Sequence, residues 1–332
     1  MSVQEPERPF GPHVLDLDCA AEAARIEAAI RAIVGRRLRR RGAVVGVSGG
    51  IDSAVCAALS ARALGPARVH ALLMPGRNSS PASAERGREL CERLGIAYDL
   101  IDIGAALEPL GCYRTRDEAI AKLFPDYRPG DRYKIAVAGD LLEKDRLNVF
   151  QLIVERDGEL RSKRMPLDVY LAIVASTNMK QRMRKLLEYH HAERRNYAVV
   201  GTPNRLEYDQ GFFVRGGDGL ADLKPIAHLY KTQVYALAEY LGVPESIRAQ
   251  TPSTDTYSLP QTQEEFYFAL SYDKMDLMLY AYTNGVPAEE VARGLGLEPR
   301  QVERAFRDIE AKRRTAAILH QHALLVADAG GG

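Results

Sequence analysis

The chain has 332 residues, of which 46% are hydrophobic and 27% are charged, and its formal net charge at pH 7 is +1. These values are ordinary for a globular protein with a substantial core, and the length allows one large α/β domain or two smaller ones. A net charge this close to zero excludes a strong overall field that would attract nucleic acid or an anionic membrane.

The N-terminus and the cysteines indicate a cytoplasmic protein. The first residues, MSVQEPERPFGPH, lack the apolar core of a signal peptide, and no later apolar run is long enough to span a bilayer. Four widely spaced cysteines lie mostly in apolar surroundings: Cys19, Cys56, Cys91 and Cys112. They are typical of reduced core residues, so we expect neither a disulfide framework nor a cysteine metal site.

The first part of the chain alternates between helices and short apolar strands. Apolar residues at helical spacing predict helices over residues 22–38, 52–64 and 82–94. Short apolar runs predict strands at residues 43–47, 68–73, 98–103 and 197–200. This alternation favours an α/β fold with a doubly wound parallel sheet, in which ligands bind beyond the carboxyl ends of the strands. Three segments would emerge at that edge: residues 48–53, 74–80 and 201–207.

The pattern changes between residues 113 and 166, which we interpret as an insertion on the α/β scaffold. Within it, residues 148–154 alternate between polar and apolar, and Asp157-Gly158 is a strong turn signal. Residues 159–165 follow the turn and would form the second strand. These features predict a β-hairpin.

The rest of the chain is predicted to be largely helical. A basic helix is expected over residues 178–193, and a helical C-terminal region over residues 263–325. We expect residues 1–20 to form an N-terminal extension, residues 21–325 to form the main domain, and the Gly-rich residues 326–332 to form a flexible tail.

The most informative motif is an apolar run, VVGV, that ends in SGGIDS and continues into an alanine-rich helical stretch. A buried strand, a glycine turn and a helix N-terminus together gather backbone N–H groups around an anion. Gly49 and Gly50 let the backbone approach a phosphate closely. Ser48 and Ser53 add hydroxyl donors, and Asp52 offers a carboxylate to a magnesium ion bound to that phosphate. The Lys-Ser/Thr pair of a Walker loop is missing from the motif.

The pattern SGGxDS after a hydrophobic strand resembles the pyrophosphate-loop family of ATP pyrophosphatases, which have the adenine nucleotide alpha-hydrolase-like fold. The resemblance implies that the loop holds the β,γ-pyrophosphate of ATP, and that ATP is cut between its α and β phosphates to leave an adenylated intermediate. A tight turn between a strand and a helix, without a ligand, is the alternative. The loop alone does not name the acceptor.

Further motifs make the resemblance more specific. SGGIDS, GTxxxxE, FFVRGGDGLAD and PIAHLYKTQV follow one another in the order found in NAD synthetase, over roughly residues 20–315. That family converts the carboxylate of nicotinic acid adenine dinucleotide (deamido-NAD) to an amide. The chain is therefore expected to be an acid–ammonia ligase.

The resemblance also implies roles for individual residues. The implied pyrophosphate-binding residues are Ser48, Gly49, Gly50, Asp52 and Ser53. The further implied ATP contacts are Thr202, Lys231, and Ser253 or Thr254. The implied magnesium ligands are Asp52 and Glu207, and the implied catalytic residues are Asp52 and Lys231. The implied contacts to the dinucleotide are Arg182, Arg215 and Asp222.

The implied reaction has two steps and several small-molecule partners. The substrate carboxylate attacks the α-phosphate of ATP, and ammonia then displaces AMP from the acyl-adenylate. Mg²⁺ is the implied cofactor, ATP the co-substrate, and a homodimer the implied assembly. No glutaminase segment is visible in the sequence, so we expect free ammonia or a separate glutaminase partner to supply the nitrogen.

Two departures from the family pattern leave the acceptor open. The family's His-Lys pair near the C-terminus is replaced by Ala311-Lys312, and its lysine in the FFxK position is Arg215. The insertion and the missing histidine favour a second hypothesis, an amide synthase that acts on a different carboxylate, whereas FFVRGGDGLAD and Arg182 argue against it. Single residues also have structural interpretations in place of the functional ones. In these, Glu207 pairs with Arg205 on the surface, and Lys231 is an ordinary residue at the start of a helix.

Two further alternatives come from other classes of protein. Residues 288–307 read AEEVARGLGLEPRQVERAFR, which is also typical of a DNA-binding helix-turn-helix. The same pattern is found in any pair of packed helices, and the net charge argues against nucleic acid. A catalytically silent binding protein is disfavoured because the pyrophosphate loop and both magnesium carboxylates are intact.

Overall fold

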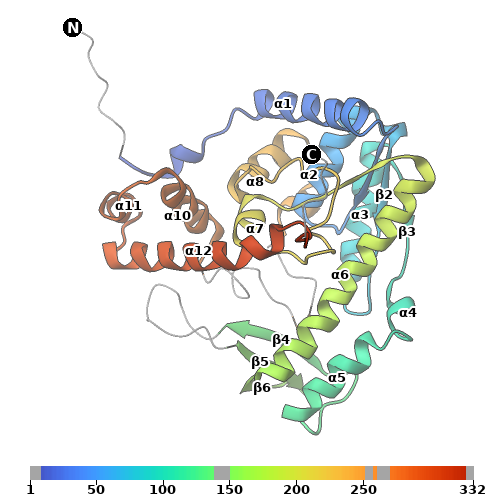
Figure 1. Ribbon diagram of the computed structural model, residues 1–332, viewed down its shortest axis with the longest axis vertical. Coiled ribbons are helices and arrows are strands. Elements are labelled where there is room, and N and C mark those ends of the chain that lie inside the picture. The colour runs from blue at the N-terminus through green and yellow to red at the C-terminus, as the bar shows by residue number, and fades with distance from the viewer. Residues whose placement is uncertain (1–8, 138–149, 251–256, 260–269, 327–332) are drawn as a thin grey trace.

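The computed structural model describes residues 9–137, 150–250, 257–259 and 270–326 (Figure 1). A parallel four-stranded sheet lies at its centre, with the strand order β3-β2-β1-β7. Its strands are β1 (Ala43–Gly46), β2 (Val69–Leu73), β3 (Ala97–Leu100) and β7 (Ala198–Val200). All four predicted strands are present, and the predicted parallel sheet is confirmed.

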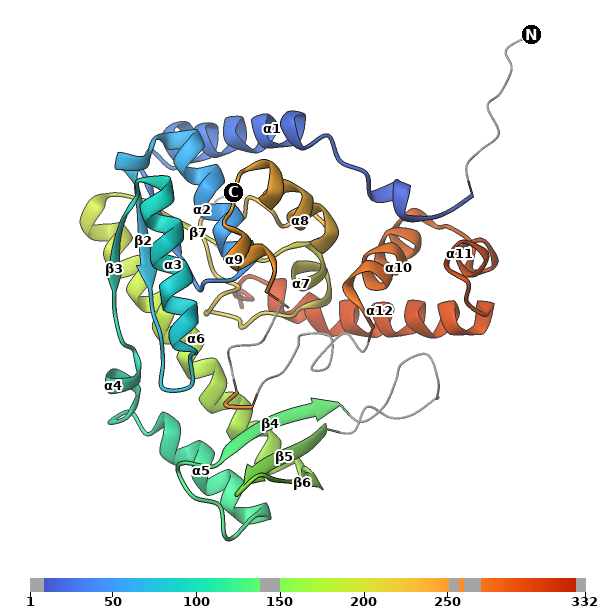
Figure 2. The same cartoon turned by 180° about the vertical axis from the view of Figure 1, so that it is seen from behind.

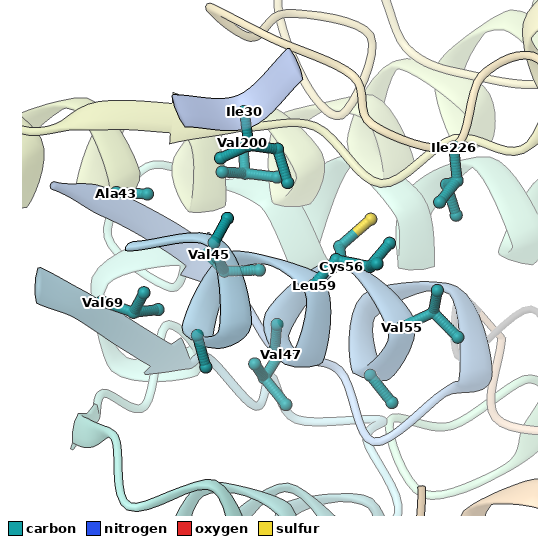
Figure 3. Packing of buried hydrophobic residues seen from close by; sticks show 14 of the residues in the cluster. Ile30, Ala43, Val45, Val47, Val55, Cys56, Leu59, Val69, Val200 and Ile226 are labelled. Carbon is teal, nitrogen blue, oxygen red and sulfur yellow. The ribbon is translucent and has the colours of Figure 1, made fainter. Parts of the chain in front are cut away.

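Helices cover both faces of this sheet because alternate strand residues are buried on opposite sides. Val45 and Val200 pack in one cluster with α1 (Cys19–Arg31) and α2 (Ile51–Leu64), as Figure 3 shows. Val44 and Val199 belong to the cluster on the other face, which α6 (Leu167–Arg195) covers. A further helix is α3 (Pro81–Leu94). The sheet is therefore doubly wound, as predicted.

Helix α2 is the most deeply buried of these helices, since twelve of its fourteen residues are buried. Most of them are small, which lets the helix lie close to the strands. Helix α2 begins five residues after the end of β1. The loop between them is therefore anchored on both sides by core elements.

The predicted β-hairpin is confirmed and belongs to a second, antiparallel sheet of three strands. Asp157 and Gly158 have φ angles of 53° and 82°, which suit a type I′ turn. The strands are β4 (Arg132–Val137), β5 (Phe150–Arg156) and β6 (Glu159–Arg164). Strand β4 was not among the predicted strands, although Tyr133 and Ile135 alternate with polar residues and are buried.

Helix α6 is longer than predicted and connects the two sheets. It has 29 residues, begins after Pro166 and ends at Asn196, which has the left-handed φ of 55°. Its first part packs on the three-stranded sheet through Val169 and Ile173, and its last part packs on the four-stranded sheet through Ala192 (Figures 1 and 2). Two further helices precede β4, namely α4 (Gly104–Leu107) and α5 (Cys112–Leu123).

The C-terminal region is helical, as predicted, and has its own apolar cluster. Met275, Val291, Val302 and Ile309 pack there against Phe10 from the N-terminal segment. The remaining helices are α7 (Arg205–Gln210), α8 (Lys231–Tyr240), α9 (Glu245–Arg248), α10 (Tyr272–Asn284), α11 (Ala288–Leu295) and α12 (Pro299–His320). Three short segments of other helical type are Pro12–Leu15, Ala32–Arg37 and Pro66–Arg68.

The helix-turn-helix pattern corresponds to α11 and α12, which are joined at Gly296. Their apolar faces pack into the C-terminal cluster, so the pattern is accounted for by helix packing. DNA binding by this pair stays a prediction. All four cysteines are free, as expected. Among the described helices, none combines the length and the apolar character needed to cross a bilayer.

Candidate active site

The loop between β1 and α2 is closed on itself by its two serines. The Ser53 hydroxyl donates to the Gly50 carbonyl oxygen at 2.8 Å, and the Ser48 backbone N–H donates to Ser53 Oγ at 3.2 Å. Gly49 has a φ of 80°, and a Cβ there would lie 2.3 Å from the Ser83 carbonyl oxygen. The turn therefore requires glycine, while Ser48 and Gly50 remain exposed to an incoming ligand.

A cation from α3 reaches the same loop. Arg86 Nε donates to the Gly49 carbonyl oxygen at 3.3 Å, and Arg86 Nη2 donates to Ser83 Oγ at 3.1 Å. The sequence motifs did not identify this arginine, because it lies more than thirty residues beyond the loop in the chain. Together with the N-terminus of α2, it makes the loop electropositive on the side where a phosphate would bind.

Lys231 and Asp52 form a buried ion pair at the start of α2. Lys231 is the first residue of α8 and is 1% exposed, and its Nζ donates to Asp52 Oδ2. Burial opposes the lysine charge, but the carboxylates of Asp52 and Glu207 outweigh it and raise the pKa of Lys231. The structure thus places a permanent cation beside a phosphate loop that has no lysine of its own.

Asn204 connects this pair to Glu207. Its side-chain amide donates to Asp52 Oδ1 at 3.2 Å and accepts from the Glu207 backbone N–H at 3.1 Å. Glu207 Oε2 accepts from the Asn204 backbone N–H at 3.1 Å, which completes a capping box at the start of α7. Asn204 is fully buried and was not among the predicted site residues, although an Asn three residues before a Glu is a recognisable helix-start signal.

The two carboxylates predicted to bind magnesium fit that role. Burial and the nearby Asp52 carboxylate together raise the pKa of Glu207 to about 8. Two neighbouring carboxylates, one of them in the first turn of α2, are suited to a hard divalent cation. Thr202, at the end of β7, is half-buried and lies two residues before Asn204.

Asp276 of α10 holds the start of α8 in place. It is fully buried, and its carboxylate accepts from the backbone N–H groups of Lys231 at 3.2 Å and Thr232 at 2.7 Å. Burial raises the pKa of this carboxyl to about 6. A C-terminal helix therefore caps the start of α8, where Lys231 lies, which no local motif indicated.

The residues predicted to bind the dinucleotide are divided between two places. Arg182 Nε donates to the Arg215 carbonyl oxygen at 3.2 Å, so these two exposed arginines lie together. Asp222 lies against β7, where its oxygens accept from the Val199 N–H at 2.7 Å and the Tyr189 hydroxyl at 3.3 Å. Ser253 and Thr254 lie outside the described residues.

The end of α12 contacts the Gly-rich segment of residues 211–219, which carries Arg215. His320 Nε2 lies 2.9 Å from the Tyr208 carbonyl oxygen, and its ring centroid is 5.1 Å from that of Phe213. Arg215 Nη2 donates to the Gln321 carbonyl oxygen at 3.1 Å. The chain thus places a histidine beside this segment, although the position that matches the family's histidine is Ala311.

A buried charged group lies between α6 and the same segment. Lys185 Nζ donates to Glu188 Oε2 at 2.5 Å, and a Cβ on Gly46 would lie 2.7 Å from Glu188 Oε1. Asp218 Oδ1 accepts from the Val214 N–H at 2.8 Å, and burial raises the pKa of both Asp218 and Glu188. These charges are at the carboxyl end of β1, beside the phosphate loop.

Known proteins are similar in sequence to this chain over most of its length. The NAD synthase family model matches residues 22–124 and 147–316. The NH(3)-dependent NAD(+) synthetase of Rhizobium meliloti (strain 1021) is 55% identical over 312 residues, which cover 94% of this chain and 93% of that protein. The NH(3)-dependent NAD(+) synthetase of Thermotoga maritima is 37% identical over 271 residues, which cover 81% of this chain and 88% of that protein.

Solved structures show the same fold. NMN synthetase from Francisella tularensis has a TM-score of 0.64 at 23% identity, over 93% of this chain and 99% of that one. NH3-dependent NAD synthetase from Campylobacter jejuni, in complex with the nitrate ion, has a TM-score of 0.59 at 23% identity, over 94% of this chain and all of that one (100%). The matched family model, the phosphate loop and the identity to the sequence relatives lead to one conclusion: the chain belongs to the NAD synthase family of ligases.

Proposed function

We propose a two-step mechanism for the ATP-dependent amidation of deamido-NAD to NAD, the reaction of the family to which this chain belongs. The observation that carries it is the connected group of Asp52, Lys231, Asn204 and Glu207 at the end of the phosphate loop, in which Lys231 and Asn204 are buried and both carboxylates are partly exposed. A catalytically silent binding protein, one of the alternatives raised by the sequence, is set aside because the family is one of ligases.

In the first step, the substrate carboxylate attacks the α-phosphate of ATP, and the bond to the bridging oxygen of pyrophosphate breaks. The loop N–H groups, with Ser48 and Ser53, hold the departing pyrophosphate. Lys231 and Arg86 supply positive charge where negative charge develops. In a site shielded from water, such preorganised charges lower the barrier by several kcal/mol.

Asp52 and Glu207 are the residues that would hold Mg²⁺. When bound, the ion neutralises charge on the departing phosphates. The chain's own contribution is to keep both carboxylates in position: Asn204 bonds to each of them, and Lys231 balances Asp52.

In the second step, ammonia attacks the carbonyl carbon of the acyl-adenylate, and AMP departs with the electrons of the broken C–O bond. A carboxylate by itself is a poor electrophile, and the adenylate provides the leaving group. Ammonia arrives free or from a separate glutaminase partner. The four free cysteines, three of them buried, are compatible with a reducing cytoplasm as the place of this reaction.

Arg182 and Arg215 are the proposed contacts to the phosphates of the dinucleotide. The Arg182 guanidinium contacts the Arg215 backbone on the exposed side of α6 and the Gly-rich segment, and two neighbouring arginines suit a diphosphate. Asp222 is proposed to act on the substrate site through its position, because its two oxygens tie Tyr189 of α6 to Val199 of β7.

A second candidate acceptor is a smaller nicotinate-containing carboxylate. The structural similarity to the NMN synthetase of Francisella tularensis favours this alternative, whereas the 55% identity to an NAD synthetase favours deamido-NAD. The test is pyrophosphate release from MgATP and ammonium in the presence of deamido-NAD or of nicotinic acid mononucleotide. We expect deamido-NAD to give NAD and AMP with the higher kcat/KM. A higher kcat/KM for the mononucleotide would identify the mononucleotide as the acceptor and leave the two-step mechanism unchanged.

We further propose that the chain works as a homodimer. Several leucines on and near α6 are exposed: Leu100, Leu110, Leu167, Leu171 and Leu186. A second copy is a partner that would remove them from water. Light scattering should give twice the chain mass for the wild type and a single chain mass for Leu171→Asp. A monomeric wild type would contradict the proposal.

A further inference from the structure

A group of metal-binding side chains lies at the other end of the four-stranded sheet. His70 comes from β2, Asp99 from β3 and His191 from α6, and one ligand atom of each lies within 4.8 Å of the others. Arg184 of α6 donates to the Met74 carbonyl oxygen just beyond the carboxyl end of β2, at 3.1 Å. The later His191 meets His70 near the start of the same strand, so α6 runs antiparallel to β2 (Figures 1 and 2).

We propose that His70, Asp99 and His191 form a binding site for a divalent transition cation, with Zn²⁺ as the best-suited ion. Two imidazoles and one carboxylate are a ligand set that zinc uses, and magnesium disfavours imidazole nitrogen. The site differs from the proposed magnesium site in its ligands, its elements and its end of the sheet.

The distances between the ligand atoms suit one ion. His70 Nε2 lies 2.9 Å from Asp99 Oδ2, and His191 Nδ1 lies 3.3 Å from the same oxygen. Zinc–ligand bonds of about 2.0–2.1 Å in a tetrahedron place neighbouring ligand atoms about 3.3 Å apart. Both imidazoles therefore direct a nitrogen to the same carboxylate oxygen, and their ring planes lie within 12° of each other.

The histidines are shielded from solvent, whereas the carboxylate is partly open. His70 and His191 are 7% and 8% exposed. The Asp99 side chain is 44% exposed and gives an ion a route of entry from solvent.

A guanidinium already occupies the open side of the group. Arg195 Nη2 lies 3.2 Å from His70 Nε2 and 3.6 Å from Asp99 Oδ2, and Arg195 Nη1 lies 3.2 Å from His191 Nδ1. Arg195 therefore sits where a cation is favourable, and it must move aside when the ion binds. Its side chain is 30% exposed and has solvent to move into. Its removal should strengthen metal binding.

The bound ion would join three elements that are far apart in the chain. It would link β2 and β3 to the last turn and a half of α6, the helix that also carries Arg182. A link of this kind stabilises the folded chain in proportion to the occupancy of the site. The expected role is therefore a structural one, which thermal unfolding detects without reference to activity.

Calorimetric titration of the metal-free chain with ZnCl2 tests the site. We expect one zinc per chain in addition to any ion at the magnesium site, and a higher Tm. His70→Gln and Asp99→Asn should each weaken this binding by more than about tenfold, since they remove a direct ligand. Arg195→Ala should strengthen it. Excess MgCl2 should leave it unchanged.

His190→Gln is the matched control, because His190 is the exposed neighbour of His191 in the sequence and lies outside the group. It should bind zinc as the wild type does. Zinc binding that persists in Asp52→Ala but is lost in His70→Gln would establish the site. The proposal would be overturned if the wild type, His70→Gln and Asp99→Asn all bound zinc equally strongly. It would also be overturned if the wild type took up no zinc at micromolar concentration. Circular dichroism confirms that each variant is folded.

Discussion

The two ends of the four-stranded sheet carry opposite kinds of chemistry. At the carboxyl end, a glycine turn, a helix N-terminus and the cation of Lys231 lie together beside the Asp52 carboxylate, where we propose that phosphate and a hard cation bind. At the other end, β2, β3 and the end of α6 bring imidazoles and Asp99 together around a guanidinium. The direction of the strands decides this difference, because helix N-termini meet the sheet at its carboxyl edge.

The ends also differ in how their charged groups are supported. Asp52 accepts from both Lys231 and Asn204, and the carboxylate of Asp276 caps the helix that begins at Lys231. At the other end, the Asp99 side chain is 44% exposed, and one of its partners is the long, flexible side chain of Arg195. We expect changes at the carboxyl end to affect catalysis, and changes at the other end to affect metal affinity and stability.

The largest effect should follow from breaking the buried ion pair at the carboxyl end. Asp52→Asn and Lys231→Gln should each lower pyrophosphate release by about 100- to 1,000-fold, because each removes charge that faces the reacting phosphates. Pyrophosphate release from MgATP with deamido-NAD and ammonium measures this.

Lys122→Ala is the control for the ion-pair variants, since Lys122 forms an exposed pair with Asp168 at 2.9 Å. It should keep full turnover. Turnover within about twofold of the wild type in either active-site variant would remove that residue from the reaction.

The phosphate loop itself offers a sharper comparison between two glycines. Gly49 and Gly65 have φ angles of 80° and 85°, but a Cβ meets the Ser83 carbonyl oxygen only at Gly49, and nothing within 4 Å at Gly65. Both Ala variants should lose about 1 kcal/mol from the backbone conformation. Gly49→Ala should in addition raise the KM for ATP by at least about tenfold, because the loop must shift. Equal KM values in the two variants would contradict a tight loop.

A smaller effect is expected where the C-terminal helices support the lysine. Asp276→Asn keeps the shape of the side chain but weakens two hydrogen bonds to α8, so kcat should fall roughly tenfold. Asp273→Asn, on the exposed side of the same helix, is the control. A kcat for Asp276→Asn that equals that of Asp273→Asn would show that α8 does not need this cap.

Asp276 should also leave a signature in the pH dependence of stability. Burial raises its pKa from 3.8 to about 6, so the folded chain binds a proton that the unfolded chain releases between these values. The wild-type free energy of unfolding should therefore lose up to about 3 kcal/mol from this group as the pH rises from about 4 to 6. Denaturant unfolding of Asp276→Asn should lack that contribution; parallel pH profiles of the two proteins would contradict it.

An effect on one substrate alone is expected at the exposed arginines. Arg182→Ala should raise the KM for deamido-NAD by about tenfold with little change in the KM for ATP, since Arg182 contacts Arg215 and not the phosphate loop. Arg194→Ala, exposed on the same helix, should leave both constants unchanged. An equal rise in the KM for ATP would place Arg182 at the nucleotide instead.

Much of the candidate site was predictable because its residues are close together in the sequence. β1, the loop and α2 follow one another without interruption, so apolar runs, glycines and a helix start indicate the phosphate loop directly. Asp157-Gly158 indicates the hairpin for the same reason, since a two-residue turn depends on its own two residues. The position of β4 was missed, because six alternating residues next to a polar stretch are a weak signal.

Other parts depend on residues that are far apart in the chain. Asn204 bonds to Asp52 across 152 positions, and Asp276 caps a helix that begins 45 positions earlier. A side chain with several possible partners does not specify which one it meets until the sheet and helices are packed. Arg86 beside Gly49, and His320 beside Phe213, are further contacts of this kind.

The sequence by itself thus determined the local chemistry of this protein: a phosphate loop, the order of strands and helices, and the family motifs around Glu207 and Lys231. The tertiary structure alone decided which charges neutralise one another, such as Lys231 with Asp52, and that His70, Asp99 and His191 meet. The physical reason is that local conformation follows from neighbouring residues, whereas burial and electrostatic pairing arise when distant elements exclude water together.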